Sequence, residues 1–491
     1  MAVPALRISL TNDAPINANG AYVLYWMIAH RRSRYHFGVQ RAVELANEHG
    51  VGVVVLEALR VGYPWASDRL HRYIIDGMED NAHSFEHPGV RYLSYVERVE
   101  GAGRGLLACL ADDAVAVVTD EFPCFFLPKM VAAAGRKLPV RLEAVDTNGV
   151  MPLRSVPRAF ARAVDFRRWL QKSSHEHLQT FPEAEPLSSL HHPTLPAVAE
   201  RVFSDWSVCD RGAPSILLSE LPIDHTVGVV EERGGENVAR QMLDTFITRA
   251  LPRYAEARNH PDDDVASGLS PALHFGHVSA HEIVRRVWDS EGFEPTNLPE
   301  KGRGSREGWW GLSPAAEGFL DQIITWRELG YAFAHHTEDH DSYDALPTWA
   351  LRSLDEHSGD ERETLYTFEE LDQAKTHDDI WNAAQRQLRQ TGRMHNYLRM
   401  LWGKRVITWT QSPREAAEIL VELNNRYALD GRNPNSYSGI FWVFGRFDRA
   451  WGPERPVYGK IRYMTSDSTR RKLRLKKYLQ EFGDTPQGSL L

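Results

Sequence analysis

Residues able to carry electrons concentrate in the C-terminal third of the chain. Nine of the fourteen tryptophans lie between Trp309 and Trp451. Trp402 and Trp409 stand seven residues apart in the segment Thr391–Trp409, so on a helix both indoles would lie along one stripe. Large aromatic side chains usually pack a core, but a stripe of indoles can also relay an electron. The spacing therefore predicts either a packed helical core or an electron-transfer path.

Polar residues interrupt the same aromatic region. Arg399, Asn424, Asp430 and Asn433 stand within it. Burying polar groups among apolar ones is costly unless they bond to one another or to a ligand. A planar polar cofactor would supply partners for these side chains, so the region is a candidate cofactor site.

A candidate phosphate site lies earlier, in the segment SGLSPALHFGHVS, Ser267–Ser279. Ser267, Gly268 and Ser270 precede a helix predicted to begin near Pro271. Backbone amides at the start of a helix, with hydroxyls nearby, can hold a phosphate or pyrophosphate. The Ser-x-x-Ser-Pro pattern is also a common helix cap, and these residues alone leave both interpretations open.

Composition limits the class of protein. With 491 residues, 42% hydrophobic and 25% charged, we expect a folded protein of two or three domains. No apolar run of about 18 residues and no signal-like start occur, so we expect no membrane span and no export. The three cysteines lack CxxC spacing, which argues against a disulfide framework or zinc ribbon and suits a reducing cytoplasm. We expect no metal site.

A nucleic-acid partner has to be argued locally, because the net charge is −9. Between Arg455 and Tyr478 there are nine Lys or Arg residues and one acid, Asp467. Such a run is either a solvated helix face or a surface that contacts phosphates.

The N-terminal third alternates strands and helices. Apolar runs predict strands at Tyr22–Met27, Val51–Leu56 and Ala114–Thr119, with an amphipathic helix at Gly38–His49. This order predicts an α/β domain with a parallel, doubly wound, Rossmann-like sheet. Because no GxGxxG motif follows a strand, a dinucleotide site there would rest on the fold alone.

The rest of the chain is predicted to be helical. Residues 182–214 are rich in Pro, His and Ser, which is typical of a connector. Helices are predicted at Glu236–Arg258, Ser279–Asp289, Ala315–His335, Asp378–Arg389, His395–Trp409 and Pro413–Asn425. The predicted organisation is an α/β domain (1–180), an interdomain linker (181–233) and an all-helical domain (234–491).

Four blocks resemble the class II photolyases of the photolyase/cryptochrome family: THDDIWNAAQ (376–385), GRMHNYLRMLW (392–402), LNNRYALDGRNPNSYSG (423–439) and PVYGKIRYM (456–464). The N-terminal blocks VLYWM and VVTD (117–120) fit more loosely. The resemblance implies a folded-back FAD in the helical domain, active in its reduced form. Excited by blue light, it would donate an electron to a pyrimidine dimer in UV-damaged DNA, and the split dimer would return the electron.

The resemblance also assigns roles to cofactor-binding residues. Arg399 and Asp430 would form an ion pair beside the isoalloxazine, and Asn424 would lie near flavin N5. Asn433 stands in the DGRNPN block where class II proteins usually carry Asp. The FAD phosphates would be held by Tyr254, Ser267, Leu269 and Ser270.

The implied electron path runs from Trp402, nearest the flavin, through Trp381 to Trp409, nearest solvent. The lesion pocket would be walled by Trp326 and Trp442, which can stack on a flipped-out dimer. The remaining substrate contacts implied by the resemblance are Met400 below the lesion, and Arg449 and Arg462 in the gap left in the duplex.

Two departures bear on which lesion is bound. Gln322 stands where cyclobutane-dimer photolyases usually carry a carboxylate, as in enzymes that act on the 6-4 photoproduct; a register shifted by one residue would put Asp321 there. In Gly439–Trp451, which is one residue shorter than usual, bulky side chains are expected to reshape the lesion-facing wall: Phe444, Arg446 and Phe447.

The expected function is therefore that of a light-driven DNA-repair lyase that splits cyclobutane pyrimidine dimers. Two alternatives stay open: a cryptochrome-like blue-light flavoprotein without repair, and repair of the 6-4 photoproduct, for which His274, His277 and His395 are candidate proton donors. The family also suggests a second, antenna chromophore, a deazaflavin or folate, in the α/β domain. A monomer in the cytoplasm is expected.

Overall fold

The computed structural model describes residues 2–299 and 302–484, which fall into two compact units. Unit 1 comprises Met1–Pro157, Ser174–Asp244 and Gly268–Asn297, and unit 2 comprises Arg158–Ser173, Thr245–Ser267 and Leu298–Leu491. Both units are discontinuous in sequence, because the chain passes between them several times. The domain boundaries at 180 and 233 remain a prediction.

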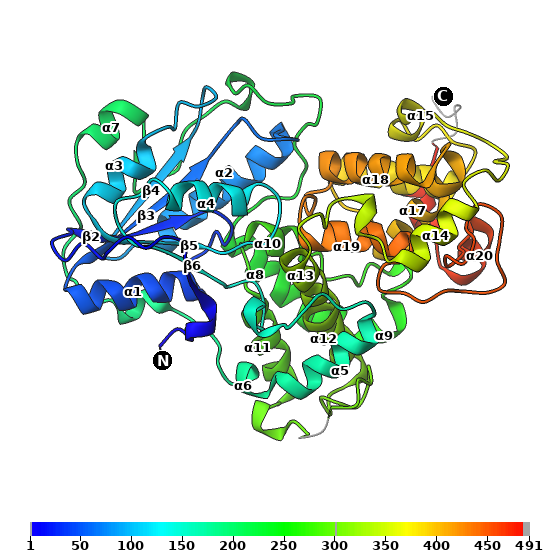
Figure 1. The fold of residues 1–491 in the computed structure, drawn as a ribbon, viewed down its shortest axis with the longest axis horizontal. Coiled ribbons are helices and arrows are strands. Elements are labelled where there is room, and N and C mark those ends of the chain that lie inside the picture. The colour runs from blue at the N-terminus through cyan, green and yellow to red at the C-terminus, as the bar shows by residue number, and fades with distance from the viewer. Residues whose placement is uncertain (1, 300–301, 485–491) are drawn as a thin grey trace. The chain divides into compact units, whose positions relative to one another are not determined.

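Unit 1 contains a seven-stranded sheet in the order β1-β6-β5-β2-β3-β4-β7. The five inner strands are parallel, and the two edge strands pair antiparallel. Figure 1 shows α1 along one face of this sheet and α3 and α4 on the other. The strands are β1 (Ile8–Leu10), β2 (Tyr22–Met27), β3 (Gly52–Leu59), β4 (Val90–Val96), β5 (Ala114–Asp120), β6 (Leu142–Val145) and β7 (Cys209–Asp210).

The predicted parallel sheet is confirmed. Every residue of β2 and β5 is buried, as expected for parallel strands that are covered on both faces. The prediction missed β4, in which Arg91 and Ser94 interrupt the apolar run, and β6, which has only four residues. The helices of unit 1 are α1 (Phe37–His49), α2 (Asp68–Ser84), α3 (Leu106–Asp112), α4 (Leu127–Gly135), α6 (His175–Leu178), α7 (Arg201–Trp206), α10 (Ser270–Phe275) and α11 (Ala280–Glu291).

Unit 2 is helical, as predicted. Predicted and observed bounds agree within two residues for α16, α17 and α18 of this unit and for α11 of unit 1, and Ser412 caps α18 by accepting Glu415 N–H at 3.2 Å. The helices of unit 2 are α5 (Ala163–Ser173), α9 (Tyr254–Ala257), α12 (Pro314–Leu320), α13 (Arg327–His336), α14 (Thr348–Glu356), α15 (Phe368–Asp372), α16 (Asp379–Thr391), α17 (Asn396–Trp409), α18 (Pro413–Tyr427), α19 (Pro434–Val443), α20 (Ser466–Lys472) and α21 (Lys476–Phe482).

Two predicted helices contain π-helical turns that the sequence did not indicate. The helix predicted at 236–258 runs as α8 (Glu236–Thr245), a π turn (Phe246–Ala250), a 3-10 turn (Leu251–Arg253) and α9. Pro252 contributes to this break because it has no N–H to donate. The other π turn, Asp321–Trp326, joins α12 to α13 and carries both Gln322 and Trp326. Such turns frequently occur at functional sites.

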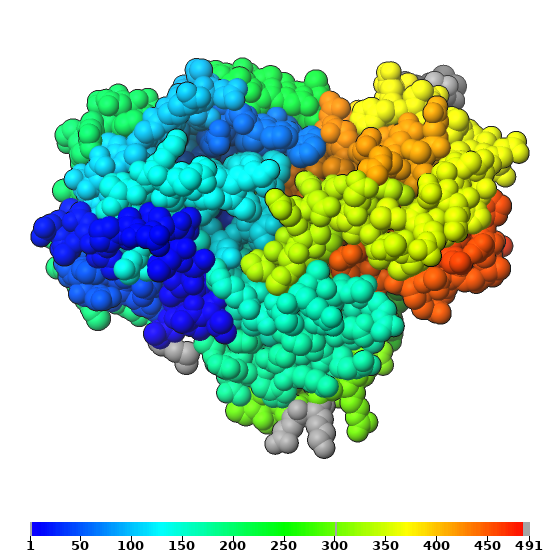
Figure 2. Space-filling model, in the orientation of Figure 1, coloured from blue at the N-terminus to red at the C-terminus, as the bar shows by residue number. Residues whose placement is uncertain are grey.

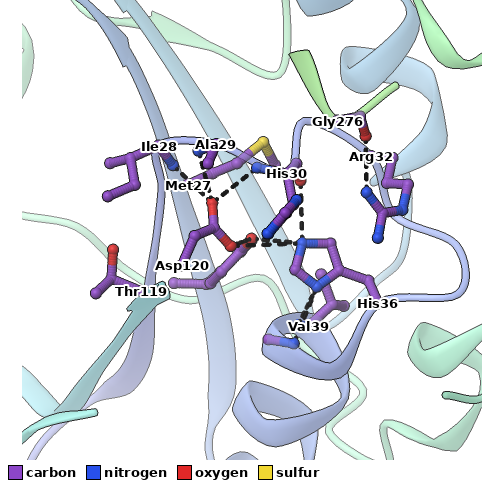
Figure 3. Close-up of polar contacts among 12 residues, drawn as sticks. Met27, Ile28, Ala29, His30, Arg32, His36, Val39, Thr119, Asp120 and Gly276 are labelled. Carbon is purple, nitrogen blue, oxygen red and sulfur yellow. Dashed lines mark hydrogen bonds and ion pairs between the residues drawn. The ribbon is translucent and has the colours of Figure 1, made fainter. Parts of the chain in front are cut away.

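A buried carboxylate fixes the point where the sheet reverses its strand order, between β2 and β5. Asp120, the last residue of β5, is fully buried and accepts the backbone N–H groups of Ile28, Ala29 and His30 at 2.8–3.0 Å (Figure 3). Its other oxygen accepts the Tyr25 hydroxyl at 2.7 Å. Ligands of parallel α/β sheets usually bind at this point. Here the Asp120 carboxylate accepts the hydrogen bonds of the backbone N–H groups instead.

His36 completes this network. Its Nδ1 caps α1 by accepting the N–H groups of Gly38 and Val39 at 2.9 and 3.3 Å, while its Nε2 lies 2.8 Å from the Tyr25 hydroxyl. Because Nδ1 accepts, any ring proton lies on Nε2. Burial lowers the pKa of His36 well below its usual range, so the ring is neutral.

Asp120→Asn tests whether this network holds unit 1 together. The amide NH₂ of asparagine would face one of the donors that the carboxylate now satisfies, so we expect a loss of about 3 kcal/mol or more in the free energy of unfolding. Urea denaturation measures it. Asp13→Asn, at an exposed position of the same unit, is the control; equal stabilities of the two variants would contradict the assignment.

Candidate functional site

Three indoles form a continuous column inside unit 2. The Trp381 and Trp402 rings stack with centroids 6.4 Å apart at an interplanar angle of 11°, and Trp381 meets Trp409 edge-on at 5.4 Å. The three side chains are 0–2% exposed. Trp381 therefore lies between the other two, and we call Trp402, Trp381 and Trp409 the indole column.

Hydrogen bonds fix the two inner indoles. Trp381 Nε1 donates to the main-chain carbonyl of Trp402, and Trp402 Nε1 donates to Gln385 Oε1, both at 2.9 Å. Gln385 Nε2 in turn donates to Asp372 O at 3.2 Å, which turns the amide oxygen toward the indole. The sequence analysis did not identify Gln385, although it lies one helical turn after Trp381 on the same face of α16.

Polar and aromatic side chains cover the outer end of the column. The Trp409 ring contacts Tyr366 at 5.4 Å and His377 at 5.6 Å, and the Arg405 guanidinium lies 4.6 Å from its centroid. The Tyr366 hydroxyl is 2.6 Å from His377 Nδ1. Tyr366 is half-buried and His377 exposed, so the column reaches the surface through its neighbours, because Trp409 is itself only 2% exposed.

The polar residues beside the column include a two-point ion pair. Arg399, on α17 with Trp402, bonds through both terminal nitrogens to the two Asp430 oxygens at 3.1 and 3.2 Å. Asn424 is 2% exposed; its Nδ2 donates to Asn425 Oδ1 at 3.3 Å, and its side-chain oxygen, Oδ1, accepts no hydrogen bond within the described residues. These groups fit a planar heterocycle with donors and acceptors on its edge, as a flavin has.

Asn433 has a structural role that the sequence did not indicate. Its Oδ1 caps α19 by accepting the N–H of Asn435 at 2.6 Å. Asparagine and aspartate cap helices about equally well. Asparagine at this position therefore preserves the helix start that an aspartate would also support, without a negative charge.

The four residues predicted to hold phosphates divide between the units. In unit 2, the Tyr254 ring is buried against Phe246 and Phe319, and Ser267 is half-buried. In unit 1, Leu269 is fully buried and Ser270 is exposed at the start of α10. The predicted helix start near Pro271 is confirmed, but α10 has six residues and no side-chain cap. Phosphate binding by these residues remains a prediction.

Cations surround the predicted lesion wall. The half-buried Trp442 ring has Lys404 Nζ at 5.5 Å and the Arg462 guanidinium at 5.4 Å. Arg462 also lies over Trp451 at 4.1 Å and pairs with Asp448 at 2.9 Å, while Arg449 lies over the same Trp451 ring at 4.4 Å. The structure thus brings Trp442, Arg449 and Arg462 together through Trp451, which the sequence analysis did not identify.

Lys404 is a fully buried amine. Its Nζ donates to the carbonyl of Val443, the residue after Trp442, and no carboxylate of the described residues lies within ion-pair distance. Burial lowers the pKa of Lys404 from 10.5 to about 7, against the opposing effect of Asp448. A carbonyl and an indole face are the partners of this cation, so it stiffens the wall at a cost in stability.

The π turn Asp321–Trp326 carries both residues considered for the carboxylate position of the lesion pocket, Asp321 and Gln322. The Asp321 carboxylate is held by Arg167 in a two-point ion pair at 2.7 and 3.0 Å. The half-buried Gln322 makes no side-chain hydrogen bond within the described part of the chain, so its amide is available to a ligand. Trp326 and Met400 are also half-buried. The helix α13, which follows Trp326, and α17, which carries Met400, both pack on α19, which carries Trp442.

The bulky residues after Trp442 pack into unit 2, and their effect on the lesion-facing wall stays a prediction. Phe444 and Phe447 are 0% and 5% exposed and contact Tyr343 and Phe333 in the core of unit 2. Arg446 lies over Phe333 at 4.4 Å. The two phenylalanine rings of this segment therefore belong to the core of unit 2.

The basic segment, Arg455–Tyr478, lies at the surface of unit 2, where Figure 2 shows it in red-orange beside yellow residues near 353. Four of its nine cations pair with acids of the same unit: Lys460–Glu454, Arg462–Asp448, Arg470–Asp379 and Arg474–Asp263. Exposed cations without a carboxylate partner among the described residues are Arg455, Arg471, Lys472, Lys476 and Lys477. These remain available to phosphates.

Two solved structures resemble this fold along almost the whole chain. A class III photolyase of Agrobacterium tumefaciens has a TM-score of 0.66 and 19% identity, covering 94% of this chain and 86% of that one. A cryptochrome of Synechocystis has a TM-score of 0.66 and 15% identity, covering 94% and 88%. The fold is that of photolyases and cryptochromes.

Sequence relatives identify the family within this fold class. A deoxyribodipyrimidine photo-lyase of Methanothermobacter thermautotrophicus is 33% identical over 478 residues, which are 97% of this chain and 98% of that protein. One of Arabidopsis thaliana is 29% identical over 472 residues, 95% of this chain and 89% of that protein. The chain belongs to the deoxyribodipyrimidine photo-lyase family. No family model matches it.

Two further features of the described residues bear on membranes and metal ions. None of their helices is both long and apolar enough to cross a membrane. Within residues 2–299 and 302–484, His, Cys, Asp and Glu side chains form no cluster of three that could hold a metal ion.

The buried Lys404 makes a prediction about pH. Its folded pKa of about 7 lies below its unfolded value of 10.5, so between these pH values the unfolded chain binds more protons and stability rises with pH. Relative to Lys404→Met, the wild type should gain about 2–4 kcal/mol in free energy of unfolding between pH 7 and pH 10, and nothing below pH 7. Urea denaturation across this range measures both free energies of unfolding. If they change with pH in parallel for the wild type and Lys404→Met, Lys404 is not a buried amine that titrates in this range.

Proposed function

We propose that this protein is a light-driven DNA-repair lyase that splits cyclobutane pyrimidine dimers in UV-damaged DNA with FAD as its cofactor. The observation that carries the proposal is the indole column, whose Trp402 and Trp409 lie on α17 together with Arg399 of the Arg399–Asp430 pair, in a chain of this family. Bound FAD would supply the photoexcited electron. The chain would orient the flavin through Arg399, Asp430, Asn424 and Asn433, and refill it with electrons through Trp402, Trp381 and Trp409.

The substrate side of the proposal rests on the residues of the lesion wall. Trp442 and Trp326 would stack on the bases of a flipped-out dimer, and the amide of Gln322 would bond to a pyrimidine edge. Met400 would support the lesion, and Arg449 and Arg462 would contact the DNA around the gap. The unpaired cations of the basic segment would bind phosphates.

Two of the three candidate histidines lack the charge that repair of the 6-4 photoproduct would require of a proton donor. Repair that needs a histidine proton donor requires an imidazolium near neutral pH. Burial lowers the pKa of His277 to about 3 and that of His395 to about 4, so both are neutral at pH 7. His277 is moreover held in unit 1, where its Nδ1 accepts the N–H of Gly235 at 2.9 Å.

A cluster of aromatic rings in unit 1 is the candidate site for an antenna pigment. Half-buried rings of Tyr63, Trp65, Phe125 and Phe126 cluster at 4.8–6.2 Å after β3 and β5, at the carboxyl end of the sheet. A planar deazaflavin or folate could stack on them. A monomer acting in the cytoplasm is the remaining part of the proposal.

Light-driven repair of defined oligonucleotides tests the proposed function. The FAD-loaded full chain should revert a single cyclobutane dimer under blue light with a thiol reductant and leave it intact in the dark. Trp402→Phe should abolish photoreduction of the cofactor, yet repair should persist after chemical reduction. Photoreduction without repair would support a cryptochrome-like flavoprotein, and reversal of only a 6-4 photoproduct would identify the other lesion; either result overturns the proposal.

Trp442→Ala tests the lesion wall. Loss of the ring removes a stacking surface, so affinity for dimer-containing DNA should fall by about 1–3 kcal/mol, while affinity for undamaged DNA changes little. Fluorescence anisotropy with the two oligonucleotides measures both. Trp65→Ala, at a half-buried indole of unit 1, is the matched control, and an equal loss on undamaged DNA would argue against lesion recognition by Trp442.

A further inference from the structure

One carboxylate beside the indole column joins three parts of unit 2. Asp378 is 6% exposed and caps α16 by accepting the N–H of Trp381 at 3.1 Å. Its other oxygen lies 3.3 Å from Arg405 Nε and accepts the hydroxyl of Ser466 at the start of α20. The roles assigned above do not use Asp378 or Arg405, although both contact residues of the column.

Arg405 places a positive charge on the face of the outermost indole. Its guanidinium carbon lies 4.6 Å from the centroid of the Trp409 ring, and its side chain is 18% exposed. A cation over an indole stabilises the neutral, electron-rich ring. Once the ring loses an electron it becomes positive, and the same cation repels it. Arg405 therefore makes Trp409 harder to oxidise.

Asp378 acts in the opposite direction. Its carboxylate offsets the charge of Arg405, and it lies at the first turn of α16, which carries Trp381. A negative charge at this position favours a positive charge on Trp381 and weakens the repulsion at Trp409. The pair is largely shielded from water, so solvent screens it less than a surface ion pair.

We propose that the Asp378–Arg405 ion pair controls electron flow through the outer half of the indole column. This inference deepens the proposed function, because it assumes that electrons pass along the column. With FAD bound, Trp402 would supply one electron to the photoexcited cofactor, Trp381 would return an electron to Trp402, and Trp409 would return one to Trp381. One electron from an external thiol then neutralises Trp409. Asp378 and Arg405 are positioning residues that set the relative cost of oxidising Trp381 and Trp409.

Two variants should have opposite effects, which loss of structure would not produce. Asp378→Asn keeps an effective helix cap but removes the charge that offsets Arg405, so cofactor photoreduction should slow about two- to fivefold. Arg405→Met keeps an apolar stem but removes the cation, so photoreduction should accelerate by a similar factor. Arg405→Lys, which retains the charge, should restore much of the wild-type rate.

The experiment measures photoreduction of the FAD-loaded full chain with a thiol, together with the lifetime of the tryptophan radical by time-resolved absorption. Asp379→Asn is the matched control, because it removes the same charge from the adjacent, exposed residue, whose partner is Arg470; its rate should equal that of the wild type. Trp402→Phe tests the column itself.

The outcomes distinguish control by the Asp378–Arg405 ion pair from electron transfer along the indole column. Opposite shifts in Asp378→Asn and Arg405→Met support control by the ion pair. Equal slowing in both, or unchanged rates in both while Trp402→Phe abolishes photoreduction, would overturn that control and leave the column intact. Normal photoreduction in Trp402→Phe would overturn the column, and the ion-pair proposal with it.

Discussion

The indole N–H groups of Trp381 and Trp402 are buried donors, and each needs an acceptor within the protein. The chain supplies both from α16 and α17: the carbonyl of Trp402 receives one and Gln385 the other, each at 2.9 Å. These two bonds fix the helices in register and hold the rings in contact. The positions of Arg399, on the same α17, and of Asp378, at the start of α16, follow from that register. A shift of α16 along α17 would break these bonds and leave the buried indole N–H groups of Trp381 and Trp402 without acceptors. The geometry of the electron path is therefore fixed.

Charge in unit 2 is arranged as a set of local pairs. Arg399 binds Asp430, Arg462 binds Asp448, Arg405 binds Asp378 and Arg167 binds Asp321. Each pair places an arginine against an aromatic ring, a candidate ligand or the core. Lys404 differs because it is buried without a carboxylate, and it lies behind Trp442. Buried charge costs stability, so its retention beside the lesion wall is consistent with a binding surface that must keep its shape.

Much of the fold could be predicted, because local sequence determines it. The apolar runs of β2 and β5 and the caps Asp378, Ser412 and Ser279 mark elements that the structure contains. Contacts between distant residues could not be predicted in this way. Nothing near Gln385 indicates an indole partner 17 residues later, and nothing near Arg462 indicates that it would lie over Trp451. The π turn that carries Gln322 was missed because its sequence has the period of an ordinary helix.

In the proposed function, unit 2 holds a flavin whose electrons pass through buried indoles. The most direct measurement is the absorption spectrum of the purified full chain after incubation with excess FAD and removal of unbound cofactor. We expect a flavin spectrum that corresponds to about one FAD per chain. This spectrum should be weakened or lost when Arg399 and Asp430 are both replaced by alanine. A colourless protein that takes up no FAD would contradict the account.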